Sequence, residues 1–337
     1  MTELVGLDLA AVQEFLGARR PDLLTGPLRG ELISGGRSNL TYMLTDGHRR
    51  WVLRRPPLGH VQATAHDMSR EYRMIAALDP TEVPVPRPVV LADDDVIGAP
   101  FYVMEHIDGA VLRSREQLAL LSGTQAQELA GSLIDVLACL HRLDYAAVGL
   151  SGLGRPEGYL DRQVARFCRQ LGQPGSRDQA GVIALGERLG HGLPQGQRAA
   201  VVHGDYRLDN VVMADGSIAA VLDWEMATLG DPLADLAITL MWWDGLCGLD
   251  SPVAAVPGEM PGFPSGEFLA ERYAAATGYD LADLPWYLGF AYWKTAVIFE
   301  GIHHRAGEGL TVGEGFDRIG ELVPALIERG TAVLAGV

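Results

Sequence analysis

The 337-residue sequence is poor in cysteine, and its few cysteines are scattered. Cys139, Cys168 and Cys247 lie far apart and lack the spacing of metal ligands, so they predict neither a disulfide framework nor a cysteine-based metal site. Such a sparse set is typical of a reducing compartment, and we expect a cytoplasmic location. The first residues, Met-Thr-Glu-Leu-Val, lack the basic and apolar segments of a signal peptide.

Basic residues are also scarce, because 27 of them face 43 acidic residues and the formal net charge is −16. Nucleic acids and anionic membranes are bound through a basic footprint, so we expect neither as a partner. No apolar stretch reaches the ~18 residues that a membrane-spanning helix requires. The acidity suits a cationic substrate, but it also serves solubility, and composition does not separate the two. Composition does not indicate an oligomeric state either.

Hydrophobic periodicity divides the chain into a β-rich part and a helical part. Five segments are predicted as strands: 28–34, 40–45, 50–55, 89–92 and 100–105. With one main helix at 64–78 they form an expected N-terminal lobe, residues 1–106. Residues 107–337 are expected to form a larger, mostly helical lobe. In its long helix at 124–144, we expect Thr124 as the N-cap, with Gln127 completing a capping box.

Residues 201–212, Val-Val-His-Gly-Asp-Tyr-Arg-Leu-Asp-Asn-Val-Val, predict a strand, a tight loop and a second strand. Asn210 follows Asp205 by five residues, and Asp223 follows in a further acidic segment. This spacing is that of phosphoryl-transfer enzymes with a protein-kinase-like fold. Their chemistry needs one carboxylate, Asp205, to orient the attacking hydroxyl. It needs a carboxamide and a second carboxylate, Asn210 and Asp223, to hold Mg²⁺ against the phosphates of ATP. The sequence therefore predicts an α+β, bilobal protein-kinase-like fold that uses ATP and Mg²⁺.

Two further polar groups accompany this loop. We expect His203 to shape the loop by hydrogen-bonding its backbone rather than to take part in chemistry. Asp231, followed by Pro232, predicts the start of the next helix, with the aspartate as N-cap and proline at the first helical position. We expect Asp235 to help anchor that helix.

A glycine-containing loop in the first lobe is a candidate phosphate-binding element. Because it joins two strands, it cannot be a Rossmann or Walker loop, both of which need a helix after the glycines. Its candidate ligands are Gly35, Gly36, Ser38 and Asn39, since glycine lets backbone N–H groups approach phosphates closely. Taken alone, the same residues fit an ordinary hairpin.

Arg54 is the candidate cation for the α- and β-phosphates, and Glu71, in the middle of the expected helix, is its candidate partner. The alternative is an ordinary strand arginine and a solvated helix glutamate. Arg55 points to the opposite face of the strand and is expected to be exposed. Glu105 and Ile107 are placed by position alone, as residues whose backbone groups bind the adenine edge.

Four arginines of the second lobe are candidate acceptor-binding residues. Arg162, Arg166 and Arg169 recur at i, i+4 and i+7, on one face of an expected helix at 158–171. This stripe could receive an anionic substrate, and a solvated, ion-paired face is the other interpretation. Arg207 either neutralises the loop around Asp205 or contacts substrate.

Four segments together resemble the aminoglycoside phosphotransferase/choline kinase-type small-molecule kinases: residues 35–42, 52–57, 203–210 and 222–227. They are most similar to the branch that includes the kinase-like domain of acyl-CoA dehydrogenase family members 10 and 11, over roughly residues 25–310. The resemblance implies an enzyme that transfers the γ-phosphate of ATP to a hydroxyl of a small molecule. It makes Asp205 the catalytic base, Asn210 and Asp223 the Mg²⁺ ligands, Glu71 the partner of the phosphate-binding cation, and Ser38 part of the phosphate-covering loop.

One residue departs from the family pattern, because the usual lysine is replaced by Arg54. A guanidinium keeps the charge and binds phosphate in a bidentate manner, but it is longer and planar. The resemblance implies hydroxy acids or their CoA esters as acceptors, whereas an aminoglycoside or other antibiotic would need a carboxylate-lined pocket. A nucleotide-binding pseudokinase scaffold is the remaining alternative. The presence of Asp205, Asn210 and Asp223 argues against a pseudokinase, and Arg54 is the only feature in favour of one.

Overall fold

The computed structural model describes residues 4–33, 39–58, 67–171, 179–196, 198–307 and 318–336. The chain divides into two compact units: 1–109 with 219–225, and 110–218 with 226–337. The predicted lobe boundary at residue 106 is purely sequential, whereas the first compact unit also takes in the later segment 219–225. Among the described residues, no helix has the length and apolarity to cross a membrane.

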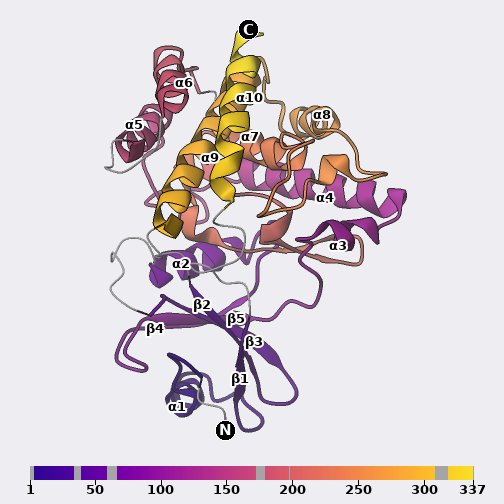
Figure 1. The fold of residues 1–337 in the computed structure, drawn as a ribbon. Coiled ribbons are helices and arrows are strands. Elements are labelled where there is room, and N and C mark those ends of the chain that lie inside the picture. The colour runs from indigo at the N-terminus through magenta and orange to yellow at the C-terminus, as the bar shows by residue number, and fades with distance from the viewer. Residues whose placement is uncertain are drawn as a thin grey trace. The chain divides into compact units, whose positions relative to one another are not determined.

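The first unit is built on an antiparallel sheet with the strand order β1-β2-β3-β5-β4 (Figure 1). Its strands are β1 (Arg29–Leu32), β2 (Leu40–Thr45), β3 (Arg50–Arg55), β4 (Pro88–Ala92) and β5 (Phe101–Glu105). All five predicted strands are therefore confirmed, with small shifts at their ends.

Opposite faces of this sheet carry different chemistry because successive strand residues point to opposite sides. Two helices accompany the sheet: α1 (Leu9–Arg19) and α2 (Met68–Leu78). Leu53 of β3 lies in the apolar core that α1 buries with Val12 and Leu16. The next residue, Arg54, pairs with Tyr102 of β5 and reaches Glu71 of α2 on the other face. Figure 1 shows α1 and α2 on the two sides of the strands.

Arg55 is buried, with an exposed fraction of 7%, so the prediction that it is exposed is wrong. Its guanidinium donates to the backbone carbonyl oxygens of Gly6 and Pro56. The segment before α1 therefore covers this face of β3. Strand alternation places Arg55 on the face opposite Arg54, but it does not show which segment covers that face.

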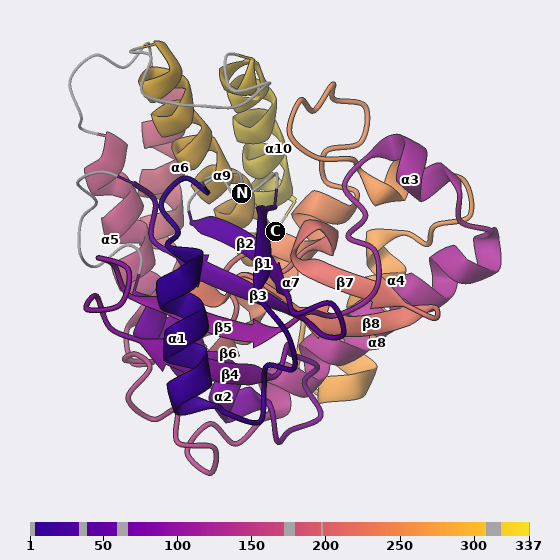
Figure 2. The same cartoon turned by 90° about the horizontal axis from the view of Figure 1, so that it is seen from below.

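The second unit is mostly helical. Its helices are α3 (Arg115–Ala119), α4 (Gly123–Arg142), α5 (Tyr159–Leu171), α6 (Ala180–His191), α7 (Pro232–Trp243), α8 (Gly266–Thr277), α9 (Leu284–Gly307) and α10 (Val323–Ala335). Helix α9 packs against α5, α6, α7 and α10. Figure 2 shows α6, α9 and α10 side by side. Two small pairs of strands complete the fold: β6 (Ala200–Val202) with β9 (Thr228–Gly230), and β7 (Val211–Ala214) with β8 (Ser217–Val221).

The start of α4 differs from its prediction. Ser122, not Thr124, is the N-cap, and Gln125 completes the capping box. Ser122 has extended dihedrals (φ −67°, ψ 160°), as an N-cap requires, whereas Thr124 already lies within the helix. The predicted start of α7 is confirmed, because the Asp231 side chain accepts from the backbone N–H of Leu233 and Pro232 is the first helical residue.

Helix α6 is absent from the sequence-based expectation. Glycine lowers helix propensity, and this helix contains Gly181, Gly186 and Gly190. A packing requirement explains one of them, since a Cβ atom at Gly186 would lie 2.6 Å from the ring of Trp293 in α9. Gly186 thus lowers the helix propensity of this segment, and the same residue lets α6 and α9 pack closely together.

Candidate active site

The loop between β6 and β7 contains the predicted His-Gly-Asp segment, and its conformation depends on Gly204. Gly204 has φ +87°, a region that residues with a side chain rarely adopt. A Cβ atom there would lie 2.9 Å from Cβ of Met226 and 3.1 Å from its carbonyl oxygen. The residue before Asp205 therefore has to be glycine for both conformational and steric reasons.

Asp235 of α7 holds this loop by its backbone. One carboxylate oxygen accepts from the Gly204 N–H at 2.7 Å, and the other accepts from the His203 N–H. The second oxygen also lies 3.3 Å from Nε2 of His141 in α4. Burial acts to raise the pKa of Asp235, but the hydrogen bond and charge of His141, together with His203 and the Gly204 N–H, lower it overall.

The role of Asp235 goes beyond the predicted anchoring of its own helix. The sequence does carry a signal for it, because Asp235 is the only charged residue within Pro232–Trp243. A single carboxylate in an apolar helix is costly to bury unless it is hydrogen-bonded. The sequence cannot show that its partners are loop N–H groups and His141, which come from distant segments.

His203 shapes the loop, as predicted. Its side chain is fully buried, and Nδ1 lies 3.3 Å from the Asp205 N–H that donates to it. His203 therefore supports the backbone on which the Asp205 carboxylate is carried.

The Asp205 carboxylate is oriented by two neighbours. Nδ2 of Asn210 donates to Oδ2 of Asp205 at 3.0 Å and to the Asp205 backbone carbonyl oxygen at 2.8 Å. Nε of Arg207 lies 3.4 Å from the same Oδ2. The side chain of Asp205 keeps an exposed fraction of 38%, so it is fixed in direction and still reachable by a small molecule.

The Asn210 carboxamide has a defined orientation. Both of its contacts to Asp205 are with oxygen acceptors, so the nitrogen must face Asp205 and Oδ1 is the remaining acceptor. An amide oxygen and a carboxylate, that of Asp223, are hard oxygen donors of the kind that Mg²⁺ prefers. In the described part of the chain, no group of three or more His, Cys, Asp or Glu side chains could hold a metal ion.

Arg207 neutralises the loop, which is one of its two predicted roles. Besides Asp205 it reaches Asp209, with Nη1 3.1 Å from Oδ2. Its guanidinium lies 4.4 Å from the ring centroid of Trp242, a cation–π arrangement that fixes its plane. A contact of Arg207 with substrate stays a prediction.

In the first unit, Arg54 connects two of the predicted site residues. Its Nε lies 3.2 Å from Oε2 of Glu71, and its Nη2 donates to Oδ1 of Asp223 at 2.9 Å. Burial acts to lower the pKa of Arg54, but the charges of Tyr102, Glu71 and Asp223 raise it overall, so the guanidinium stays protonated. The predicted pairing of Arg54 with Glu71 is present in the structure.

Glu71 is the buried centre of this group. Its Oε2 also accepts from the Tyr102 hydroxyl at 2.9 Å, and its Oε1 accepts from Nδ2 of Asn39 at 3.2 Å. Asn39 reaches Glu225 as well, at 3.3 Å. Burial raises the pKa of Glu71, and the charge of Arg54 acts in the opposite direction. The phosphate contact predicted for Asn39 stays a prediction, and Gly35, Gly36 and Ser38 lie outside the described residues.

Asp223 has a left-handed backbone conformation, with φ +63°. Such a conformation costs free energy in a residue with a side chain, and it occurs often at functional sites. The following residue, Trp224, is buried, and its Nε1 donates to the Val221 carbonyl oxygen at 3.0 Å. The turn that carries Asp223 is thus held by the indole.

The predicted adenine-binding segment follows β5. The N–H of Glu105 donates to the Arg87 carbonyl oxygen at 2.9 Å, and the N–H of His106 donates to that of Arg50 at 3.1 Å. The N–H of Glu105 is thus used within the protein, so we expect the carbonyl oxygen of Glu105 to bind the adenine edge. At Ile107 we expect the backbone N–H to do so.

The three arginines of α5 are all exposed, opposite the apolar residues that the helix buries. The guanidinium of Arg162 donates to the backbone carbonyl oxygens of Arg155 and Glu157, so it closes the turn before α5. Arg166 lies against Phe167, with its guanidinium 5.6 Å from the ring centroid. Neither arginine forms a described ion pair, and the same is true of Arg169.

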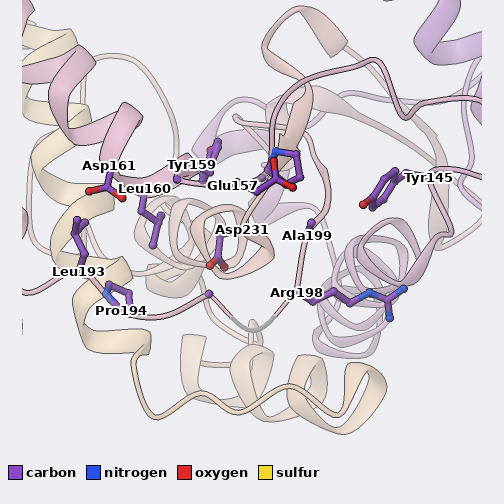
Figure 3. A pocket seen from close by; sticks show the side chains of 14 residues that line it. Tyr145, Glu157, Tyr159, Leu160, Asp161, Leu193, Pro194, Arg198, Ala199 and Asp231 are labelled. Atoms are coloured by element: carbon purple, nitrogen blue, oxygen red, sulfur yellow. The ribbon is translucent and has the colours of Figure 1, made fainter.

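A cavity of about 450 Å³ lies in the second unit, at the start of α5 (Figure 3). Its polar lining comprises Tyr145, Glu157, Tyr159, Asp161, Arg198 and Asp231. The lining thus contains three carboxylates and one guanidinium. The described lining includes neither the catalytic-loop residues nor the three arginines of α5.

Comparison with known proteins places the chain in a family. A model of the phosphotransferase enzyme family matches residues 29–288. Acyl-CoA dehydrogenase family member 11 of Gallus gallus is 33% identical over 320 residues, which cover 92% of this chain and 41% of that protein. The chain thus spans about two fifths or less of the length of the curated relatives it matches.

Solved structures of aminoglycoside phosphotransferases are similar in fold to this chain. A Ralstonia eutropha protein, described as a candidate aminoglycoside phosphotransferase, has a TM-score of 0.83 and 30% identity, with coverage of 97% of this chain and 98% of that one. A thermostable mutant of aminoglycoside phosphotransferase APH(4)-Ia, in complex with AMP-PNP and hygromycin B, has a TM-score of 0.62 at 16% identity and covers 96% and 98%. That similarity shows the fold alone.

The predicted α+β, kinase-like fold and the resemblance to the branch of acyl-CoA dehydrogenase family members 10 and 11 are both confirmed. The chain belongs to the phosphotransferase enzyme family.

Proposed function

We propose that this protein transfers the γ-phosphoryl group of ATP to a hydroxyl group of a small molecule, with Asp205 as the catalytic base. The observation that carries the proposal is the Asp205 carboxylate, which Asn210 and Arg207 orient while it stays 38% exposed. A carboxylate in this state can accept the hydrogen of an acceptor hydroxyl and direct its oxygen at the γ-phosphorus. Catalysis of this kind consists of positioning and charge neutralisation.

The other site residues take supporting roles in the same proposal. Arg54 binds the phosphates that are not transferred, and Glu71 keeps it in place. Asn210 and Asp223 supply oxygen ligands to Mg²⁺. When bound, Mg²⁺ neutralises the charge of the β- and γ-phosphates. The loop residues Gly35, Gly36, Ser38 and Asn39 cover the phosphates, and backbone groups of Glu105 and Ile107 bind the adenine edge.

ATP as the donor is supported by the AMP-PNP complex of APH(4)-Ia, which shares the fold. The same proposal includes a cytoplasmic location, in line with the three scattered cysteines, and small molecules rather than nucleic acid or membranes as partners, in line with the acidic composition.

We propose hydroxy acids or hydroxyacyl-CoA esters as acceptors. The names of the curated relatives support this class, and so do the exposed Arg162, Arg166 and Arg169. A cationic acceptor of the aminoglycoside type is the second candidate. It is favoured by the cavity, in which Glu157, Asp161 and Asp231 supply the carboxylates that such a molecule requires.

An acceptor panel separates these two candidates. The panel comprises hydroxy acids, hydroxyacyl-CoA esters, aminoglycosides, macrolides and choline-like amines, with ADP release as the readout. For an anionic acceptor, we expect the double variant Arg166→Ala/Arg169→Ala to raise KM, and Glu157→Gln/Asp161→Asn to leave it unchanged. A response to cations alone, with the opposite pattern in the variants, overturns the proposal for anionic acceptors.

The base assignment has its own test. Asp205→Asn should lower kcat by at least 10²-fold, because the loop keeps its shape but the neutral carboxamide is too weak a base to accept the proton of the hydroxyl group. Binding of Mg-ATP, measured as a thermal shift, should persist. Turnover at the wild-type rate would refute the role of Asp205. Binding of Mg-ATP by wild-type protein without any ADP release would favour a pseudokinase.

A further inference from the structure

Lys294 is a cation in a part of α9 that is otherwise uncharged. Its neighbours on the helix, Phe290, Ala291, Trp293 and Val297, are all buried. Lys294 itself is half-buried, and its Nζ donates to the backbone carbonyl oxygen of Gly204 at 2.9 Å. An ammonium group is costly to bring into such surroundings, so an apolar residue would serve packing alone equally well.

The carbonyl that Lys294 binds belongs to the peptide group whose nitrogen is that of Asp205. The orientation of this peptide plane sets the direction in which the Asp205 side chain leaves the backbone. The preceding N–H, that of Gly204, is bound by Asp235 of α7 at 2.7 Å. Gly204 is therefore held at both ends, by α7 through its N–H and by α9 through its carbonyl oxygen.

Charge also links Lys294 to the loop. Burial lowers the pKa of Lys294, while the carboxylates of Asp205 and Asp235 act to keep it protonated and Arg166 opposes them. The hydrogen bond to Gly204 places the ammonium group of Lys294 beside the residue that precedes Asp205. The hydrogen bond fixes the backbone, and the charge attracts the carboxylate that the backbone carries.

We propose that Lys294 is a positioning residue for phosphoryl transfer, which fixes the 204–205 peptide and thereby the direction of the Asp205 carboxylate. The inference rests on the proposed role of Asp205. It assigns a function to a residue from α9, 90 positions from Gly204 and outside the motif segments. A misplacement of a catalytic group by about 1 Å is enough to cost about 10²-fold in rate.

The test compares Lys294→Met with Lys294→Arg. Methionine keeps much of the apolar length and removes the donor and the charge, so we expect kcat to fall about 10²-fold with KM for Mg-ATP within about twofold. Arginine keeps both donor and charge and should recover at least a tenth of the wild-type kcat. Turnover is measured as ADP release with any acceptor that responds, or as slow ATP hydrolysis.

Arg188→Met is the matched control. Arg188 of α6 also donates to a backbone carbonyl, that of Leu334 at 2.7 Å, but it does not contact the catalytic loop. Arg188→Met should lower the melting temperature no more than Lys294→Met does, because Arg188 is exposed, and it should leave kcat unchanged. A similar loss of kcat in both variants, or a kcat for Lys294→Met within threefold of wild type, overturns the proposal.

A second measurement keeps the inference separate from the proposed function. Lys294→Met should speed hydrogen–deuterium exchange at the Gly204 and Asp205 amides, whereas Lys294→Arg and Arg188→Met should leave it unchanged. If wild-type protein shows no turnover, the proposed function fails while this exchange pattern still supports the positioning role. Unchanged exchange in Lys294→Met refutes that role, whatever the enzyme activity.

Discussion

The two units hold their site residues in different ways. In the first unit, charged side chains neutralise one another, since Arg54 bridges Glu71 and Asp223. In the second unit, Asp235 binds backbone N–H groups, and Asp205 stays partly exposed. A pair of side chains can rearrange by rotation when an anionic ligand arrives. A backbone segment that is hydrogen-bonded through both its N–H and its carbonyl oxygen cannot rearrange in this way. The structure thus combines an adaptable set of side chains in the first unit with a loop in the second unit whose backbone is held in place.

The largest expected effect comes from removing the anchor of the loop. Asp235→Ala leaves His141 and two loop N–H groups without their partner, and we expect it to lower the free energy of unfolding by about 3–5 kcal/mol. Urea denaturation measures this change. The control is Asp135→Ala, which removes an exposed ion pair with Arg272 and should cost at most about 1 kcal/mol. Similar losses in the two variants would contradict a special role for Asp235.

Gly204→Ala tests the rigidity of the loop directly. The positive φ and the contact with Met226 together should cost about 2–3 kcal/mol and lower kcat. Gly278→Ala serves as the control, because Gly278 has φ +74° but no atom within 4 Å of an added Cβ. It should cost about 1 kcal/mol and leave kcat unchanged. Equal effects in the two variants would show that conformation alone, without the contact, accounts for the glycine.

Glu71→Gln tests the adaptable side. The substitution keeps a hydrogen-bonding group for Tyr102 but removes the charge beside Arg54, which retains Asp223 at 2.9 Å. We expect a loss of about 2 kcal/mol in unfolding free energy and a higher KM for Mg-ATP, with a smaller effect on kcat. Urea denaturation and steady-state kinetics provide both values. A fall in kcat at constant KM would place Glu71 with the catalytic loop instead.

The smallest effect concerns Asp46, a carboxylate that binds backbone N–H groups as Asp235 does, but outside both site regions. It accepts from the N–H groups of Thr25, His48 and Arg49. Burial acts to raise the pKa of Asp46, but these N–H groups lower it well below its ordinary value of 3.8. Its stabilising contribution is therefore complete above pH 3.8 and is lost as the pH falls below that value.

Asp46→Asn should consequently cost about 1 kcal/mol at pH 7 and less at pH 3, with turnover unchanged. Thermal unfolding of wild type and variant at the two pH values measures the difference. A cost that grows as the pH falls would reverse the sign of this linkage.

Much of the fold could be predicted because its signals are local. The alternation along β2, β3 and β5 and the Asp231-Pro232 start of α7 lie within short windows, and both are confirmed. The prediction fails where tertiary packing determines whether a residue is buried or a helix forms. Arg55 is buried because the segment around Gly6 covers it. Helix α6 is not predicted because its glycines lower the helix propensity, although one of them, Gly186, is needed for packing against Trp293.

In the candidate site, too, some features follow from the sequence and others only from the tertiary structure. The spacing of Asp205, Asn210 and Asp223 predicts a phosphotransferase, and the family of the chain agrees with this prediction. The Arg54–Glu71 pair follows from their places on a strand and a helix, and the structure contains it. The roles of His141, Asp235 and Lys294 could not be predicted because their partners lie 31 to 94 residues away.

The sequence by itself thus determined the five strands of the first unit, the start of α7, the family and the spacing of Asp205, Asn210 and Asp223, because periodicity and spacing are local properties. Only the tertiary structure decided that Gly204 is held between α7 and α9, that the guanidinium of Arg207 lies over the ring of Trp242, and that the described lining of the carboxylate-containing cavity does not include the arginines of α5. The physical reason is that these contacts join residues that are far apart in the sequence, and only packing brings them within a few ångströms.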